Sequence, residues 1–332
     1  MLSRSSARRA ALALIVLTAG IALLVWQVQS VGLDQILRSL SQVGWGFLVI
    51  LALSFARFAL RSLAWTTLLG GGVPLKSAIA ATMAGDGISN LTPLSLLLGE
   101  PTKALYLRDR VPPSRSFPAL AAENFFYSVS VAVFIVLGTL AMLEAFDVPD
   151  DLRIAGVVSL ALMLALLAGA LWIGWRRPAM VSALVARVPI PAVRKLFDRV
   201  ERLESTTYGF LRGAERPLGP VIACETAFHI VSFAEMYYTL WLITGESAPL
   251  AAFVLDTFNR IVAIVFRAIP LRLGVDEWST AIIAPGIGFS GTVGVTIALI
   301  RKGRLFVWAV VGVVLAVRNG LRVRDVMKTP NS

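Results

Sequence analysis

Several charged residues lie inside stretches that are otherwise apolar, and these residues are the ones that could do chemistry. Residues 90–103 and 267–277 combine basic and acidic side chains with proline and glycine, and residues 301–304 read Arg-Lys-Gly-Arg. A guanidinium group can donate two hydrogen bonds to one phosphate, and a carboxylate inside a membrane usually pairs with a cation or serves a proton relay. The pattern therefore indicates a buried site for a charged ligand.

The composition indicates a membrane protein. Hydrophobic residues make up 57% of the 332 residues and charged residues 15%, and the mean hydropathy is +0.77. Soluble domains are typically about 45–50% apolar and about 25% charged. Residues 10–33, 154–175 and 278–300 carry no charge, and runs of roughly 18 apolar residues can cross a bilayer as helices. We expect an all-α polytopic membrane protein.

Cysteine, net charge and the N-terminal stretch exclude other classes. Cys224 is the one cysteine, so no internal disulfide can form. The net charge of +11 is explained by basic cytoplasmic loops, so we expect no nucleic-acid partner. The basic start and the apolar run at 10–29 could be a secretory signal peptide, but the run is long and further spans follow. We interpret it as an uncleaved first span.

Six spanning helices and two interrupted segments follow from the apolar runs. We expect spans at 10–29, 44–69, 117–143, 154–175, 217–243 and 291–317. The interrupted segments are 77–108 and 249–285, and the amphipathic stretches are 33–43 and the basic 176–216. Ordinary proline kinks inside full spans are the alternative interpretation of the interruptions.

Lysine and arginine in short loops orient the chain, because they favour the cytoplasmic side. Both termini are then cytoplasmic, and each interrupted segment enters and leaves on the same face as a re-entrant, broken-helix hairpin. The first hairpin enters from the cytoplasmic face and the second from the outer face. The order of elements repeats with inverted orientation, which divides the chain into a first half at 10–143 and a second half at 154–318. Matched Pro/Gly interruptions in two halves indicate a transport site near the midplane.

The cations at 301–304 fall near the middle of the last predicted span. A central arginine costs about 2.5–3.5 kcal/mol to insert, so this position requires an aqueous cavity or carboxylate partners. The alternative is a full span at 278–300 with a loop at 301–304.

Together these motifs resemble a known family. The order and spacing are similar to the transmembrane domain of lysylphosphatidylglycerol synthases and its stand-alone flippase-like relatives, over roughly residues 10–320. The motifs are Asn90…Thr92-Pro93, Gly99-Glu100-Pro101 with Lys103, Glu123, Pro270…Gly274 with Glu277, and Arg301. The resemblance implies a protein of the bacterial inner membrane that moves lipids or lipid-linked head groups between leaflets. Since the sequence ends soon after the sixth span, we expect no aminoacyl-transferase domain.

We expect the head group to lie in a polar cavity between the two hairpins. The expected lining is Asn90, Pro93, Gly99, Glu100, Lys103, Glu123, Asn124, Arg267, Pro270, Arg272, Gly274, Glu277 and Arg301. Further cations that suit a phosphate are Arg57, Arg61 and Arg260. Proton coupling could involve Glu123, Glu225 and His229. The alternatives are permanent ion pairs and a histidine that is hydrogen-bonded between helices.

The sequence favours a translocase of phospholipids or polyprenyl-linked lipids, with membrane lipids as partners. No metalloprotease histidine pair, glycine-rich phosphate loop or Cys/His cluster occurs, so we expect no cofactor, metal or catalytic residue. A membrane-embedded lipid-modifying transferase, or an accessory subunit of a lipid or glycan pathway, remains the alternative.

The inverted repeat places Ser290 on the outer side. A cysteine introduced by Ser290→Cys should react with a membrane-impermeant thiol reagent added outside intact cells and not with reagent added from the cytoplasm. Labelling from the cytoplasmic side would contradict the inverted topology.

Overall fold

The computed structural model describes residues 43–91, 95–176, 218–267, 269–272 and 274–320. Within these ranges the regular structure is helical throughout, with no strand, so the expected all-α membrane fold is confirmed. The predicted span at 10–29 and nearly all of the amphipathic stretches at 33–43 and 176–216 lie outside the described residues.

The first set of helices follows the order predicted for the first half. It consists of α3 (Gly46–Leu69), α4 (Leu75–Leu91), α5 (Ser95–Tyr106) and α6 (Pro113–Ala145). The interruption predicted within 77–108 separates α4 from α5, which pack against each other. Gly70 ends α3 with φ of 70°, a conformation that glycine adopts without steric cost.

The second set repeats this order. It consists of α10 (Leu218–Thr244), α11 (Pro249–Val265), the 3₁₀ turn η1 (Pro270–Arg272), α12 (Val275–Gly286) and α13 (Gly291–Arg318). The axes of α10 and α11 differ by 119° across their break. Leu271 and Arg272 have positive φ, so the chain turns sharply between α11 and α12. Each set thus has a long helix, a broken pair and another long helix, while the inverted orientation stays a prediction.

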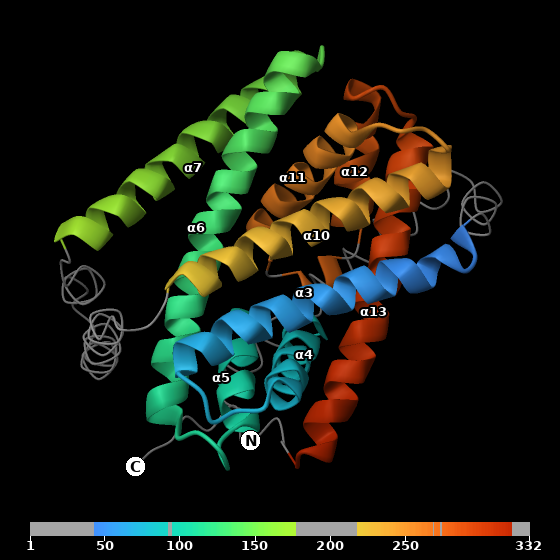
Figure 1. Cartoon of the computed structure of the whole chain (residues 1–332). Coiled ribbons are helices and arrows are strands. Elements are labelled where there is room, and N and C mark those ends of the chain that lie inside the picture. Colours follow the sequence, from blue (N-terminus) through green and yellow to red (C-terminus); the bar gives the residue numbers. More distant parts are fainter. Residues whose placement is uncertain (1–42, 92–94, 177–217, 268, 273, 321–332) are drawn as a thin grey trace, which may run out of the picture.

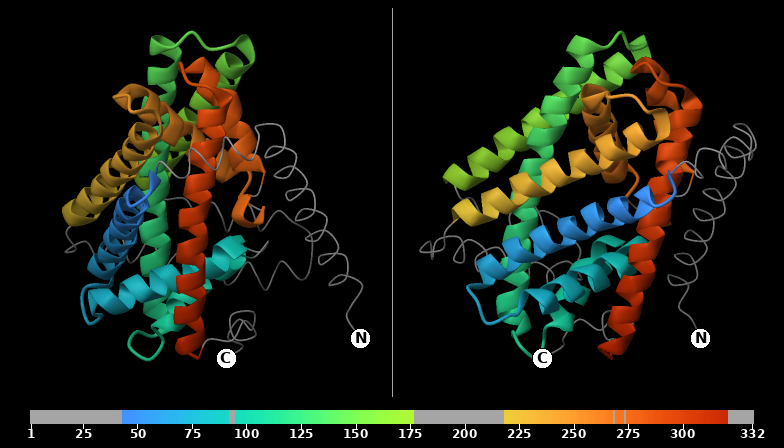
Figure 2. Two further views of the ribbon diagram at one scale, coloured as in Figure 1. Left: turned by 90° about the vertical axis from the view of Figure 1, so that its right-hand side faces the viewer. Right: turned by 45° about the vertical axis from the view of Figure 1, so that its right-hand side comes forward.

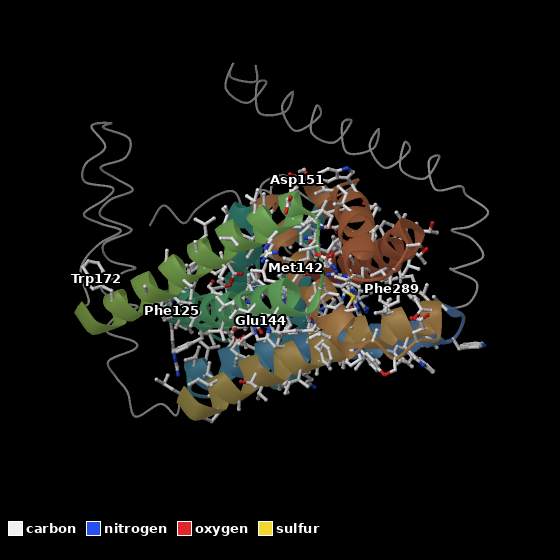
Figure 3. All side chains as sticks on the ribbon, turned by 90° about the horizontal axis from the view of Figure 1, so that it is seen from above. Phe125, Met142, Glu144, Asp151, Trp172 and Phe289 are labelled. Carbon is white, nitrogen blue, oxygen red and sulfur yellow. The ribbon has the colours of Figure 1, made fainter. Side chains whose placement is uncertain are left out.

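The two sets interlock (Figure 1). The helix α3 packs along α10, and the broken pair of each set contacts the last helix of the other, α4 against α13 and α11 against α6. Figure 2 shows α13 crossing the molecule beside α4. The remaining helix, α7 (Asp150–Arg176), packs on α6. Figure 3 shows it along one edge, with Asp151 near its start and Trp172 toward its end.

The apolar surface fits a bilayer. The helices α3 and α6 and residues 150–169 of α7 are long and apolar enough to cross a membrane, and the bent pair of α10 and α11 counts as a fourth span if it is taken together. Ile154 and Leu162 of α7 are 63% and 60% exposed, as lipid-facing side chains are.

The predicted last span is one unbroken helix. Because α13 continues through Arg301, Lys302 and Arg304, the alternative with a loop at 301–304 is wrong. The long helices among the described residues begin and end within four residues of the predicted spans.

Glycine allows α4 and α13 to cross at close range. A Cβ atom on Gly87 would lie 2.8 Å from the carbonyl oxygen of Ala309 and 3.0 Å from Cα of Gly312. Small residues permit such backbone contact between helices in membranes, where packing rather than the hydrophobic effect drives association. This crossing joins the first broken pair to the helix that carries the mid-span cations.

We therefore expect Gly87→Val to lower the melting temperature of the purified protein in detergent, because overpacking a helix contact costs about 1–3 kcal/mol or more. Gly169→Val is the matched control, since a Cβ atom on Gly169 would meet nothing within 4 Å. Equal melting temperatures for the two variants would contradict the close crossing.

Candidate functional site: a cationic cavity between the broken helices

A cavity of about 470 Å³ lies where the two broken pairs meet the long helices. Its lining is rich in basic side chains: Arg57, Arg61, Lys103, Arg260, Arg267, Arg272, Arg301 and Arg304. Three carboxylates also line it: Asp86, Glu100 and Asp256. A low-dielectric cavity with this excess of cations attracts anions, because opposite charges interact strongly away from water.

The helix α3 contributes Arg57 and Arg61, which share a face because they are four residues apart. Arg61 donates to both carboxylate oxygens of Glu123 on α6, at 2.7 and 2.9 Å, and to Asn124 Oδ1 at 3.2 Å. Glu123 is 2% exposed and does not line the cavity. Glu123 therefore forms an ion pair with Arg61, which was the alternative interpretation. Asn124 does line the cavity, as expected.

Glu235 of α10 joins three helices. It accepts a hydrogen bond from Arg57 of α3 at 3.1 Å and another from Arg304 of α13. Glu235 is 3% exposed and Arg304 7%, so the contact is buried. One carboxylate therefore serves two guanidinium groups, which leaves this cluster with a positive charge.

The helix α11 contributes an acid–base pair that the sequence analysis did not assign as a pair. Arg260 donates to Asp256 Oδ2 at 2.9 Å, and Ser232 of α10 donates to the same carboxylate at 3.0 Å. Asn259, between Asp256 and Arg260 in the sequence, also lines the cavity. The signal was present, because aspartate and arginine four residues apart on an apolar helix form an i,i+4 pair.

The first broken pair places its predicted residues on the cavity. Asn90, Gly99, Glu100 and Lys103 all line it, while Pro93 lies outside the described residues. Lys103 pairs with Glu100 at 2.8 Å. A Cβ atom on Gly85 of α4 would lie 2.7 Å from the carbonyl oxygen of Gly99, so glycine lets the two helices approach each other beside the cavity.

The second broken pair divides its predicted residues between the cavity and a structural role. Arg267 and Arg272 line the cavity, and Arg272 pairs with Asp276 at 3.0 Å. Glu277 is fully buried and instead pairs with Lys302 of α13 at 2.7 Å. That contact ties α12 to α13 outside the lining.

Two further predicted residues, Pro270 and Gly274, shape the backbone near the cavity without lining it. Pro270 begins η1. Gly274 precedes α12 with φ of 78°, which a glycine adopts readily.

Arg301 differs from its neighbours. It lines the cavity, and no carboxylate of the described residues forms an ion pair with it. One terminal nitrogen of its guanidinium group is buried without a hydrogen-bond acceptor. A buried charge that lacks a partner requires a ligand or water.

Glu225 and His229 lie elsewhere, in an apolar groove of about 900 Å³ between α6, α10 and α11. Ser130 Oγ lies 2.9 Å from His229 Nε2 and donates to Glu225 at 3.4 Å. The ring of Phe134 stacks on His229, with 5.0 Å between ring centroids. The guanidinium of Arg260 lies 4.2 Å from that Phe134 centroid. An aromatic side chain thus lies between this groove and a cation of the cavity.

The sequence matches a known family. The family model described as lysylphosphatidylglycerol synthase TM region matches residues 10–313. No curated protein matches, and no solved structure does.

Glu235→Gln would leave the buried Arg304 and the half-buried Arg57 without their carboxylate. We expect the free energy of unfolding to fall by about 3–5 kcal/mol, as it does when a buried ion pair loses one partner, in chemical denaturation in detergent. Adding Arg304→Gln to this variant should recover part of the loss, because it removes the stranded charge.

Glu246→Gln is the control, since Glu246 is exposed in the loop between α10 and α11. A Glu235→Gln protein that unfolds like the control would contradict the role of this carboxylate in joining the three helices.

Proposed function

Because the chain belongs to the lysylphosphatidylglycerol synthase transmembrane-region family, we propose that it is a lipid translocase of the bacterial inner membrane. It holds the head group of a phospholipid or polyprenyl-linked lipid in the cationic cavity while the chains stay in the bilayer. The observation that carries this proposal is the convergence of eight basic side chains on one cavity enclosed by apolar helices.

The charge arrangement suits a head group that must both enter and leave. Six of the eight cations pair with carboxylates, so most of them offer a ligand only part of their charge. A guanidinium group has five N–H donors, and a carboxylate partner occupies at most two, which leaves the others for phosphate oxygens. Binding spread over several partly neutralised groups is specific without being irreversible.

The interlocked helices offer a route for movement. If the two sets are an inverted repeat with cytoplasmic termini, rocking one against the other along α3 and α10 would expose the cavity to each side in turn. The apolar groove beside Phe134 would accommodate hydrocarbon chains while the head group crosses. Proton coupling through Glu225 or His229 would then act from the groove rather than from the cavity.

The proposal predicts that purified protein in proteoliposomes moves fluorescent lipids between leaflets faster than empty vesicles do. Ala263→Trp should reduce movement to the level of empty vesicles, because Ala263 lines the cavity and an indole would fill it. Ala165→Trp should move lipid like the wild type, since Ala165 is exposed on α7.

If anionic, zwitterionic and aminoacylated lipids all stay in place, with and without a proton gradient, the translocase proposal is wrong. Mass spectrometry of the same lipids tests the alternative, because an altered head group would assign the cavity to a lipid-modifying transferase instead.

A further inference from the structure

Four arginines form one part of the cavity, which we call the anion subsite. They are Arg57 of α3, Arg260 of α11, and Arg301 and Arg304 of α13, and all four line the cavity. The guanidinium groups of Arg57 and Arg260 lie 4.8 and 5.8 Å from the ring centroid of Phe228. Arg304 shares Glu235 with Arg57, and Arg301 is one helical turn from Arg304.

The arginines of this subsite carry two more positive charges than their carboxylate partners neutralise. Its four arginines have two carboxylate partners, Glu235 and Asp256. Elsewhere the ion pairs balance one to one, as with Arg61–Glu123, Lys103–Glu100 and Arg272–Asp276. Asp86 and Arg267, also in the lining, add one charge of each sign. The excess therefore lies in the anion subsite.

The same arginines carry buried donors without acceptors. Nε of Arg57, Nε of Arg304 and a terminal nitrogen of Arg301 have no hydrogen-bond partner within the described residues. Leaving a buried charged donor unsatisfied is costly, and such groups in native proteins usually have a ligand, water or ion. Three such donors belong to this one subsite, which has an excess charge of +2. An anion with several oxygens would balance the charge and provide hydrogen-bond acceptors.

Resting on the proposed function, we infer that the preferred lipid has a doubly charged phosphate, as a phosphomonoester or a diphosphate. A phosphodiester head group has one negative charge and would leave one arginine charge uncompensated. A zwitterionic head group adds an ammonium group, which four arginines repel. A phosphomonoester at pH 8 has two charges and three terminal oxygens, so it would balance the excess charge and offer several acceptors to these arginines.

The test measures ligand-induced thermal stabilisation of the full-length protein in a neutral detergent at pH 8. The probes are phosphatidic acid, phosphatidylglycerol and phosphatidylcholine with identical short chains, and inorganic phosphate. Phosphatidic acid should reach half-saturation at a concentration at least about ten-fold below that of phosphatidylglycerol, since one more charge-assisted hydrogen bond strengthens binding by about that factor.

Arg301→Gln reduces the excess to one charge and should remove the preference for phosphatidic acid. Arg110→Gln is the matched control, because Arg110 is exposed in the loop after α5, and it should keep the preference.

If Arg301→Gln does not fold, the wild type provides a second test. Acidification to pH 5.5 protonates a phosphomonoester, whose second pKa is about 6, so phosphatidic acid should lose its advantage while phosphatidylglycerol binds as before.

Equal half-saturation by phosphatidic acid and phosphatidylglycerol at pH 8 would overturn the inference. So would inorganic phosphate binding as tightly as phosphatidic acid, because the ligand would then be a free phosphate rather than a lipid. These outcomes are separate from the translocase proposal, which stands if any lipid is moved in proteoliposomes and fails if none is, whichever probe binds best.

Discussion

The structure depends on a simple electrostatic constraint: a charge inside a membrane protein needs either an opposite charge or a polar space beside it. Glu235 shows the constraint most clearly, because it accepts hydrogen bonds from Arg57 and Arg304 and so joins three helices. Charges in a low-dielectric interior attract strongly but lose their hydration, so such contacts fix the helices that supply them. Apolar side chains also pack these helices together away from the cavity, as Ile50 of α3 and Ile300 of α13 do, so the charged contacts add to that packing where the helices border the cavity.

The same constraint explains why α13 can hold cations at mid-span. Lys302 pairs with Glu277, Arg304 pairs with Glu235, and Arg301 lines the cavity. Each of the three directions provides what lipid lacks, namely a carboxylate or a polar space. The broken pairs follow similar reasoning, because helix ends inside a membrane protein expose backbone groups that only protein or water can satisfy. Their position beside the cavity is therefore a consequence of their being broken.

Helix positions could be predicted from the sequence, whereas the partners that side chains find on other helices could not. Apolar run length and Pro/Gly interruptions determine where helices begin and end, so α3, α10 and α13 match the predicted spans closely. Which way a side chain faces depends on the rotation of its helix against its neighbours. Glu277 was expected in the cavity, yet rotation of α12 points it toward Lys302. Similarly, His229 and Glu225 face the apolar groove rather than the cavity.

Stability and binding make opposite demands on such a cavity. Full compensation, as for Arg61 with Glu123, stabilises the fold but leaves little charge for a ligand. Complete absence of compensation would attract an anion strongly but would oppose folding and insertion. The chain separates the two demands in space: balanced pairs join α3 to α6 and α12 to α13, while Arg301 is left without a carboxylate at the surface of the cavity. An anion that completes the charge balance would therefore stabilise the helices around it as it binds, and its departure would loosen them. In the proposed translocase, this would couple occupancy of the cavity to movement of the two sets.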